Sequence, residues 1–404
     1  MQQKFTIETS FYHYTIVGAG ASGLWLAYAM LEQKILVNQT LCIVECDPGK
    51  TNDRTWCYWA EKPLSPLEII SKEWEFISNP QKTALSPFKY YHVRSADFYN
   101  NLKKTLQACP NVFWRMDKVE HVIASGNDAT LSTSQSEWRT NFVFMSALPS
   151  TISVTDCLPA TLAKSPLRPG GQTKTEVFLW QSFIGWRIKT DEPVFDESQM
   201  SMMQFNIAQN GNTQFMYVLP FSKSEALVEM TRFGGGKLTL KEAQPEIKQF
   251  LENIQCGYHI LETETGAIPM TPAFDALKKH LPSCARIVWM GTVGGAIKPT
   301  TGYGFKRMHT YAYALAEALK YGRVFPTMYR PWRFRMYDKL LLHVLKEKPE
   351  QGKPVFERLF RTQPIQRILR FLDEETSLRE EILIFYKLPV RLFLTYLVKQ
   401  TFNR

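Results

Sequence analysis

The chain has 404 residues, of which 45% are hydrophobic and 21% charged, values ordinary for a soluble globular protein with one large core or two to three smaller ones. Seven cysteines occur without a CxxC pair, which argues against a disulfide framework or a zinc site and for reduced thiols in the cytoplasm. The net charge of +10 comes without an N-terminal signal pattern or an apolar run long enough to span a membrane, so we expect neither a secreted nor a transmembrane chain.

The N-terminal region predicts a strand, a helix and a second strand. Residues 14–18 (YTIVG) form a continuous apolar run suited to a buried parallel strand. Residues 21–33 then show helical spacing of apolar side chains. Residues 41–45 (LCIVE) are the second predicted strand. This order is typical of an α/β dinucleotide-binding fold.

The turn between the first strand and the helix carries a glycine motif, G-x-G-x-x-G, at residues 18–23. Gly18 allows the tight turn, Gly20 lets a pyrophosphate approach the backbone, and Gly23 lets the helix pack on the strand. Ser22 and the free N–H groups of the helix N-terminus would face the phosphates. Glu45 closes the second strand, where an acid accepts hydrogen bonds from ribose hydroxyls. We therefore predict a dinucleotide site.

The middle of the chain has a different pattern. Residues 199–209, 214–221 and 226–233 read as three antiparallel strands, and the turns between them contain Asn210-Gly211-Asn212 and Ser222-Lys223-Ser224-Glu225. A continuous antiparallel sheet inserted into an α/β protein usually forms a separate layer that covers a ligand.

Near residue 287 the chain returns to a buried strand (IVWMG), a glycine-rich turn and a helix over 308–322. Many FAD enzymes contribute a second glycine-rich segment that reaches the ribityl chain and the pyrophosphate, so residues 290–305 favour FAD over NAD. Thr292 stands where that segment commonly has an acid, which would leave ribityl contacts to backbone N–H groups. The glycines predicted to contact the cofactor are Gly291, Gly294, Gly295 and Gly302.

The C-terminal region, residues 323–404, reads as mostly helical and carries 17 Lys and Arg against 9 Asp and Glu. Basic residues interleaved with aromatic and aliphatic ones suit an anionic lipid surface. Nucleic acid is the other acidic partner that such a balance allows. A solvated helical face is the third interpretation, and it needs no partner.

Five segments of the chain, in this order, resemble the flavin-dependent lycopene cyclases of carotenoid biosynthesis. The resemblance implies a reaction without net redox change, in which the terminal double bond of an acyclic polyene is protonated and the resulting cation closes a six-membered ring. It also implies FAD in its reduced form, with NADPH as the usual reductant. The segments are IVGAGASGLWLA, IVECDPGKTNDRTWCYW, QSFIGWRIKTDEPVFD, YVLPFSKSEALVEMTRF and GTVGGAIKPTTGYGF.

The resemblance places the family's key acid at Glu229, whereas a second acid of the same pattern is replaced by Met230 and another by Gln204. Side chains alternate between the two faces of a strand, so Glu229 shares one face with Leu227, Thr231 and Phe233. Burial among apolar groups would raise the pKa of this carboxyl, as a proton donor to an alkene requires. The alternative is a solvated charge on the outer face of the sheet. The predicted substrate-pocket residues are Leu227, Thr231, Phe233, Lys298, Pro299, Thr301 and Tyr303.

Two arginines, Arg54 and Arg94, are further candidates for supporting the flavin; for Arg94 a surface position is the alternative. The string Phe371 to Leu378 is similar to an acid-rich catalytic string of plant cyclases. It lies outside the matched order, and Ser377 with Glu380 forms a capping box that would start the next helix. We interpret it as a helix junction.

The predicted fold is α/β: an FAD-binding dinucleotide domain split between residues 1–165 and 281–322, an antiparallel substrate-covering domain at 166–280, and a basic helical region at 323–404. The expected activity is cyclisation of the ends of lycopene to β-rings on the inner face of the cell membrane. Another FAD-dependent oxidoreductase of this fold, such as an aromatic monooxygenase or a prenyl reductase, is the nearest alternative. A basic nucleic-acid-binding protein is the less favoured one.

Overall fold

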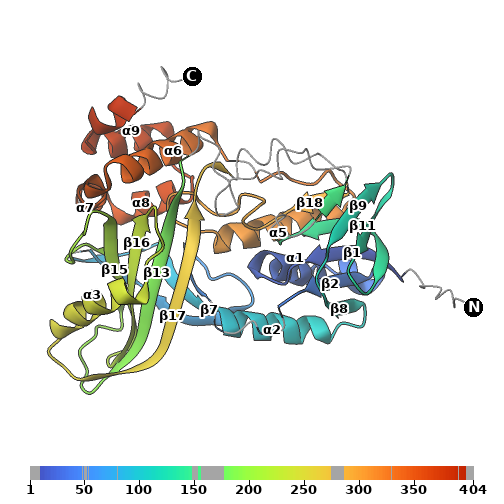
Figure 1. Cartoon of the computed structure of the whole chain (residues 1–404), viewed down its shortest axis with the longest axis horizontal. Helices are drawn as coiled ribbons and strands as arrows, with labels where there is room; N and C mark the ends of the chain where they lie inside the picture. The colour runs from blue at the N-terminus through green and yellow to red at the C-terminus, as the bar shows by residue number, and fades with distance from the viewer. Residues whose placement is uncertain are drawn as a thin grey trace, which may run out of the picture.

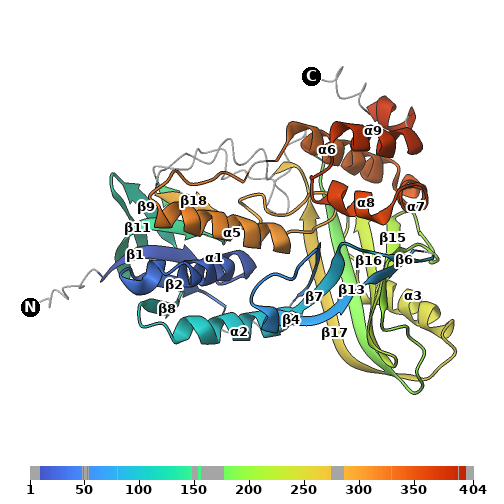
Figure 2. The same ribbon diagram turned by 180° about the vertical axis from the view of Figure 1, so that it is seen from behind.

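Two large β-sheets form two neighbouring lobes, and the C-terminal helices lie beside the second of them (Figure 1). Figure 2 shows from behind that strands β4 (Ile70–Trp74) and β7 (Lys89–Arg94) of a smaller sheet lie between the lobes. The predicted domain boundaries at 165/166 and 280/281 fall outside the described residues. The computed structural model describes residues 10–47, 49, 52, 54–79, 81–147, 153–155, 177–273, 286–328, 330–389 and 391–396.

The N-terminal residues form the predicted strand–helix–strand unit. Strand β1 (Ser10–Val17) pairs in parallel with β2 (Leu41–Glu45), and α1 (Ala21–Glu32) connects them. Every residue of β2 is buried, as its continuous apolar sequence indicates. The order of this sheet is β12-β9-β10-β11-β1-β2-β8, and β18 pairs with β11. The other strands are β8 (Val112–Met116), β9 (His121–Ser125), β10 (Asp128–Ser132), β11 (Glu137–Met145), β12 (Ser153–Thr155) and β18 (Ile287–Trp289).

The return of the chain near residue 287 is confirmed: β18 adds to the first sheet in parallel, and α5 (Phe305–Lys320) follows the glycine-rich turn. Helices α5 and α2 (Ser95–Gln107) share one core with α1. In that core the ring of Trp25 lies 5.0 Å from that of Phe98 and 5.5 Å from that of Phe305. The two segments predicted to hold a cofactor are therefore packed against each other.

The second sheet has the order β17-β13-β16-β15-β14-β5-β6. Its predicted antiparallel pairs, β14 with β15 and β15 with β16, are present. The connection after β14 is longer than predicted, because the strand ends at Gln204 and not at residue 209. The predicted turn is still present within it, and Asn210 and Gly211 both have positive φ there. The strands are β5 (Phe76–Ser78), β6 (Lys82–Ala84), β13 (Leu179–Thr190), β14 (Gln199–Gln204), β15 (Thr213–Ser222), β16 (Glu225–Gly234) and β17 (Tyr258–Met270).

Each face of the second sheet has its own cover. Helix α3 (Leu240–Glu252) packs on one face, where Val228 and Met230 of β16 point. The other face carries Leu227 and Phe233 and packs on the C-terminal helices. The acidic string before α9 is a helix junction, as predicted, and the Ser377 and Glu380 side chains form the capping box. The C-terminal helices are α6 (Trp332–Glu347), α7 (Gly352–Thr362), α8 (Ile365–Leu372) and α9 (Leu378–Lys387).

A three-stranded sheet of β3 (Thr55–Ala60), β7 (Lys89–Arg94) and β4 (Ile70–Trp74) completes the framework. Within the described part of the chain, no helix is both long enough and apolar enough to cross a membrane. Among the described residues, short 3-10 turns lie at Ile35–Val37, Leu67–Ile69 and Pro349–Gln351.

Candidate functional site

The first glycine motif has the backbone geometry that its sequence predicts. Gly18 has a φ of +97°, a conformation that side chains rarely adopt. A Cβ on Gly23 would lie 2.1 Å from the Gly18 carbonyl oxygen, so the close approach of α1 to β1 requires glycine there. A Cβ on Gly20 would meet nothing within 4 Å, so the space beside this residue is open.

Glu45 holds this loop in place. One carboxylate oxygen accepts a hydrogen bond from the Ala19 N–H at 2.8 Å, and the other accepts from the Asp47 N–H at 3.0 Å. The side chain is 5% exposed. Glu45 is thus anchored at the end of β2, where the glycine motif predicts an acid that binds the ribose hydroxyls.

The second glycine segment lies against the first. Gly291 has a φ of +59°, and a Cβ on it would lie 3.3 Å from the Ser22 Cβ. Gly294 and Gly295 shape the turn: a Cβ on Gly294 would lie 2.7 Å from the Trp289 carbonyl oxygen, and Gly295 has a φ of +81°. These two glycines therefore hold the backbone in place and do not line the adjoining cavity.

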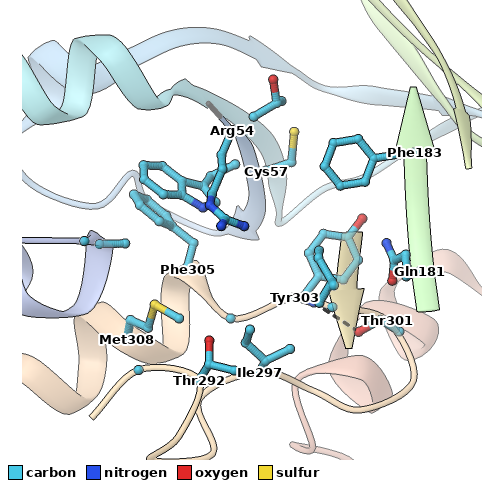
Figure 3. Close-up of a pocket in the computed structure, with 18 of the residues that line it drawn as sticks. Arg54, Cys57, Gln181, Phe183, Thr292, Ile297, Thr301, Tyr303, Phe305 and Met308 are labelled. Carbon is cyan, nitrogen blue, oxygen red and sulfur yellow. Dashed lines mark hydrogen bonds between the residues drawn. The ribbon is translucent and has the colours of Figure 1, made fainter. Parts of the chain in front are cut away.

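A cavity of about 330 Å³ begins at these two loops and ends at the second sheet. Its volume is within the usual range for a small-molecule site. Figure 3 shows Phe183, Gln181 and Tyr303 together on one side of it and Thr292 with Met308 on another. The predicted site residues that line it are Gly20, Ser22, Arg54, Leu227, Glu229, Gly291, Thr301, Gly302 and Tyr303.

The glycine-loop end of the cavity fits a phosphate-bearing cofactor. The Ser22 hydroxyl oxygen is buried and has no hydrogen-bond partner among the described residues. The first N–H groups of a helix lack intrahelical acceptors, and those of α1 begin beside the open space at Gly20. The side chain of Arg54 points into the same cavity (Figure 3). Donors and a positive charge thus meet where the fold offers room.

The carboxyl group of Glu229 on β16 lines the sheet end of the cavity, and the carboxyl group of Glu264 on β17 interacts with it from outside the cavity lining. The Thr231 hydroxyl donates to Glu229 at 2.9 Å, and the Thr55 hydroxyl donates to Glu264 at 2.6 Å. Burial raises the pKa of Glu229 well above its usual value, and the charge of Glu264 raises that pKa further. Burial and the neighbouring acid thus both favour the neutral form of Glu229, whose side chain faces the cavity, not the α3 face of the sheet.

Tyrosine side chains line the cavity together with the Glu229 carboxyl group. The hydroxyls of Tyr90 and Tyr303 are 3.0 Å apart, and Tyr217 bonds to Tyr303. Burial raises the pKa of all three phenols, so each remains a neutral ring with a hydrogen to donate. The ring of Phe183 lines the same space. The cavity thus brings a buried carboxyl group with a raised pKa together with several aromatic rings.

Several predicted residues lie elsewhere. Lys298 was expected in the substrate pocket, but it is 3% exposed and its ammonium group is 3.0 Å from Asp338 and 3.3 Å from Glu374. A buried ammonium requires paired carboxylates, and the C-terminal helical region supplies both of these partners. Pro299 is buried beside it and does not line the cavity. Lys298 therefore ties the second glycine segment to the C-terminal region.

Phe233 and Arg94 also lie outside the cavity lining. Phe233 packs in the apolar core beneath the C-terminal helices, because β16 has passed the cavity by that residue. Arg94 pairs with Glu262 at 3.1 Å and borders a separate small cavity. Thr231 does not line the main cavity, but its hydroxyl bonds to Glu229.

Sequence reasoning missed Glu264 and the aromatic lining. Glu262 and Glu264 alternate with threonines in LETETG, a period-2 pattern that predicts a strand with both acids on one face. That pattern does not reveal that the face lies over the cavity, because β17 reaches it only by pairing with β13.

A family model and two curated relatives all match this chain under the same family name. The family model described as "Lycopene cyclase protein" matches residues 14–397. The chain is 23% identical to lycopene beta-cyclase of Pseudescherichia vulneris over 93% of both chains. It is 30% identical to lycopene beta-cyclase of Paracoccus sp. (strain N81106 / MBIC 01143) over 125 residues, which are 31% of this chain and 32% of that protein.

Solved structures share the fold. HpxO of Klebsiella pneumoniae, complexed with FAD and uric acid, matches with a TM-score of 0.61 and 13% identity over 93% of this chain and 97% of that one. A geranylgeranyl bacteriochlorophyll reductase-like protein of Thermoplasma acidophilum matches with a TM-score of 0.54 and 14% identity over 95% and 98%. These likenesses show the fold, which is that of FAD-binding flavoproteins.

Proposed function

This chain belongs to the lycopene cyclase family, and on that premise we propose that it is a lycopene β-cyclase that converts the acyclic ends of lycopene to β-rings without net redox change. The observation that carries the proposal is the buried carboxyl group of Glu229, with its raised pKa, in a cavity that begins at a dinucleotide loop. An alkene is a very weak base, so its protonation needs an un-ionised acid held in a dry site.

We propose FAD as the cofactor, with NADPH as its reductant. Ser22, the N-terminus of α1 and the backbone at Gly20 would hold the pyrophosphate, Glu45 the ribose, and Arg54 and the Gly291 segment the middle of the molecule. A reduced flavin, when bound, supplies an electron-rich ring close to a developing positive charge.

The chain's own side chains perform the proton chemistry. Glu229 donates its proton to the terminal double bond of the polyene, which leaves a tertiary carbocation. The neighbouring double bond attacks that cation and closes the ring, and a proton is then lost. Tyr90, Tyr217 and Tyr303 line the site, and the face of one desolvated aromatic ring contributes about 2 kcal/mol to stabilising a cation. Reactants and products have the same atoms and the same oxidation state.

Expression in a lycopene-accumulating bacterium, followed by pigment chromatography, tests the function directly. We expect lycopene to be replaced by products with β-rings. Unchanged lycopene beside a folded, flavin-loaded protein would contradict the proposal. The flavoprotein alternative predicts that purified enzyme consumes one NADPH for each product, whereas a cyclase turns over many times after a single reduction.

Lycopene dissolves in membranes, so we propose that the chain docks on an anionic bilayer at the cytoplasmic face. Helix α9 presents an apolar stripe to solvent: Leu378 is 62% exposed, Ile382 66% and Tyr386 74%. Side chains at this spacing share one face of a helix. Exposed basic residues flank the stripe at Arg379 and Lys387. An apolar stripe bordered by positive charge suits the interface of anionic lipids and does not suit nucleic acid.

The double substitution Ile382→Ser and Tyr386→Ser tests this surface. Each exposed apolar side chain contributes about 1.5 kcal/mol or more when buried in lipid, so we expect at least tenfold weaker binding to phosphatidylcholine/phosphatidylglycerol vesicles in a sedimentation assay. Leu240→Ser is the matched control, because Leu240 is 55% exposed on α3, away from α9 (Figure 1). Equal binding by the double variant and the wild type would exclude α9 as the docking surface.

A further inference from the structure

Glu229, Gly185 and Glu264 form one row across three adjacent strands. Gly185 of β13 is the register partner of Glu229 on one side and of Glu264 on the other. A Cβ on Gly185 would lie 3.0 Å from the Glu264 Cγ and 3.0 Å from the Leu227 Cδ1. Because the middle residue has no side chain, the two carboxyl groups meet above its backbone.

The hydrogen bonds around this pair leave one carboxyl oxygen between the two side chains without a donor. Thr231 donates to an oxygen of Glu229, and Thr55 donates to the Oε2 of Glu264. The Oε1 of Glu264 is buried and has no donor among the described residues. Two ionised carboxylates would face each other with acceptors only, whereas a single proton between them satisfies both.

We infer that Glu264 is a positioning residue that shares one proton with Glu229 above Gly185 and thereby keeps Glu229 ready to donate. This inference rests on the proposed function. Glu229 gives the proton to the substrate, which leaves the pair with two negative charges beside the carbocation. The ring carbon then loses one proton, and the return of one proton to the pair restores the starting state. Protons and charges therefore balance over each cycle.

The surroundings of Glu264 differ from those of Glu229. Glu264 borders a second, small polar cavity of about 20 Å³, whereas Glu229 lines the main one. Thr55 and Leu227 line both cavities, so the pair stands between them. Glu264 therefore connects Glu229, the reacting acid, to a polar space outside the substrate cavity. The charged and titratable groups that face the pair are His92 and Arg94 of β7, Arg187 of β13, Glu262 of β17, Cys57 of β3, Tyr90, Tyr217 and Tyr303.

Glu264→Gln tests the inference through the pH dependence of turnover. The neutral amide removes the negative charge that holds the proton on Glu229, so the pKa of Glu229 falls. We expect the alkaline limb of the kcat profile to move about one pH unit or more towards acid, with KM and flavin content close to wild type. Glu252→Gln is the control: Glu252 is exposed at the end of α3, which packs on the opposite face of the sheet from Glu229.

Gly185→Ala provides a second variant that keeps both acids. Its methyl group enters the space between the carboxyl groups. We therefore expect the alkaline limb of the kcat profile to move towards acid, and kcat itself to fall at least tenfold. Alkaline limbs in both variants that superimpose on the wild type would overturn the inference.

An infrared measurement separates this inference from the proposed function. At neutral pH the wild-type chain should show the C=O stretch of a protonated carboxyl group, and Glu264→Gln should lose it at lower pH than the wild type. This band does not depend on turnover. A wild-type chain with the band but without ring formation would refute the cyclase function and support the shared proton. Absence of the band from the wild type would refute the shared proton.

Discussion

Glu229→Gln should abolish ring closure and leave the flavin bound. Glutamine has the shape of glutamic acid but no proton of comparable acidity, so the alkene cannot be protonated. General acid catalysis contributes about 10²–10⁴-fold, and we expect a loss of roughly 10³-fold in kcat. Product formation from lycopene in vesicles, measured by pigment chromatography beside the flavin absorbance, checks this result. Near-normal turnover in the variant would remove Glu229 from its role.

The same substitution, which lowers activity, should make the stability of the protein less sensitive to rising pH. Because folding raises the pKa of Glu229 above its usual 4.5, the native chain binds this proton more tightly than the unfolded chain does. The free energy of unfolding therefore falls as the pH rises above 4.5 and through the raised pKa. The Gln variant lacks this group, so its denaturation midpoint should decline less over that window. A steeper decline would show that Glu229 is ionised in the folded protein.

Gly20→Ala should weaken flavin binding at least tenfold and leave the fold intact. The new methyl group meets nothing within 4 Å in the protein, but it would occupy the space through which a pyrophosphate approaches the backbone. Titration of the flavin-free protein with FAD gives the affinity, and thermal unfolding of the flavin-free protein gives the stability. Unchanged affinity would place the pyrophosphate elsewhere.

Two further glycines serve as comparisons. In Gly23→Ala the Cβ would lie 2.1 Å from the Gly18 carbonyl oxygen, so α1 must move away from β1 and the flavin-free protein itself should lose stability. Gly235→Ala is the neutral control, since its Cβ also meets nothing within 4 Å and the residue is exposed beyond the end of β16. Loss of flavin binding without loss of stability is thus expected of Gly20→Ala alone among the three.

Local patterns were sufficient for much of this fold. The strand–turn–helix at Gly18 to Gly23 was predictable because turn geometry and helix packing depend on residues that are neighbours in the chain. Strand period alone placed Glu229 on one face of β16 with Leu227, Thr231 and Phe233, but it left open whether that face is buried or solvated. The capping box of Ser377 and Glu380 was also predictable, since its hydrogen bonds span one helical turn.

Long-range pairing decided what the sequence left open. Glu264 becomes the partner of Glu229 only because β13 lies between β16 and β17 with Gly185 in register, and a strand's own residues do not state which strand pairs beside it. Lys298 was assigned to the wrong environment for the same reason: its carboxylate partners come from the distant C-terminal region. Nearby residues thus determined the elements and their faces, whereas burial and sheet register, which exist only after the chain has closed on itself, decided the chemistry of the acid.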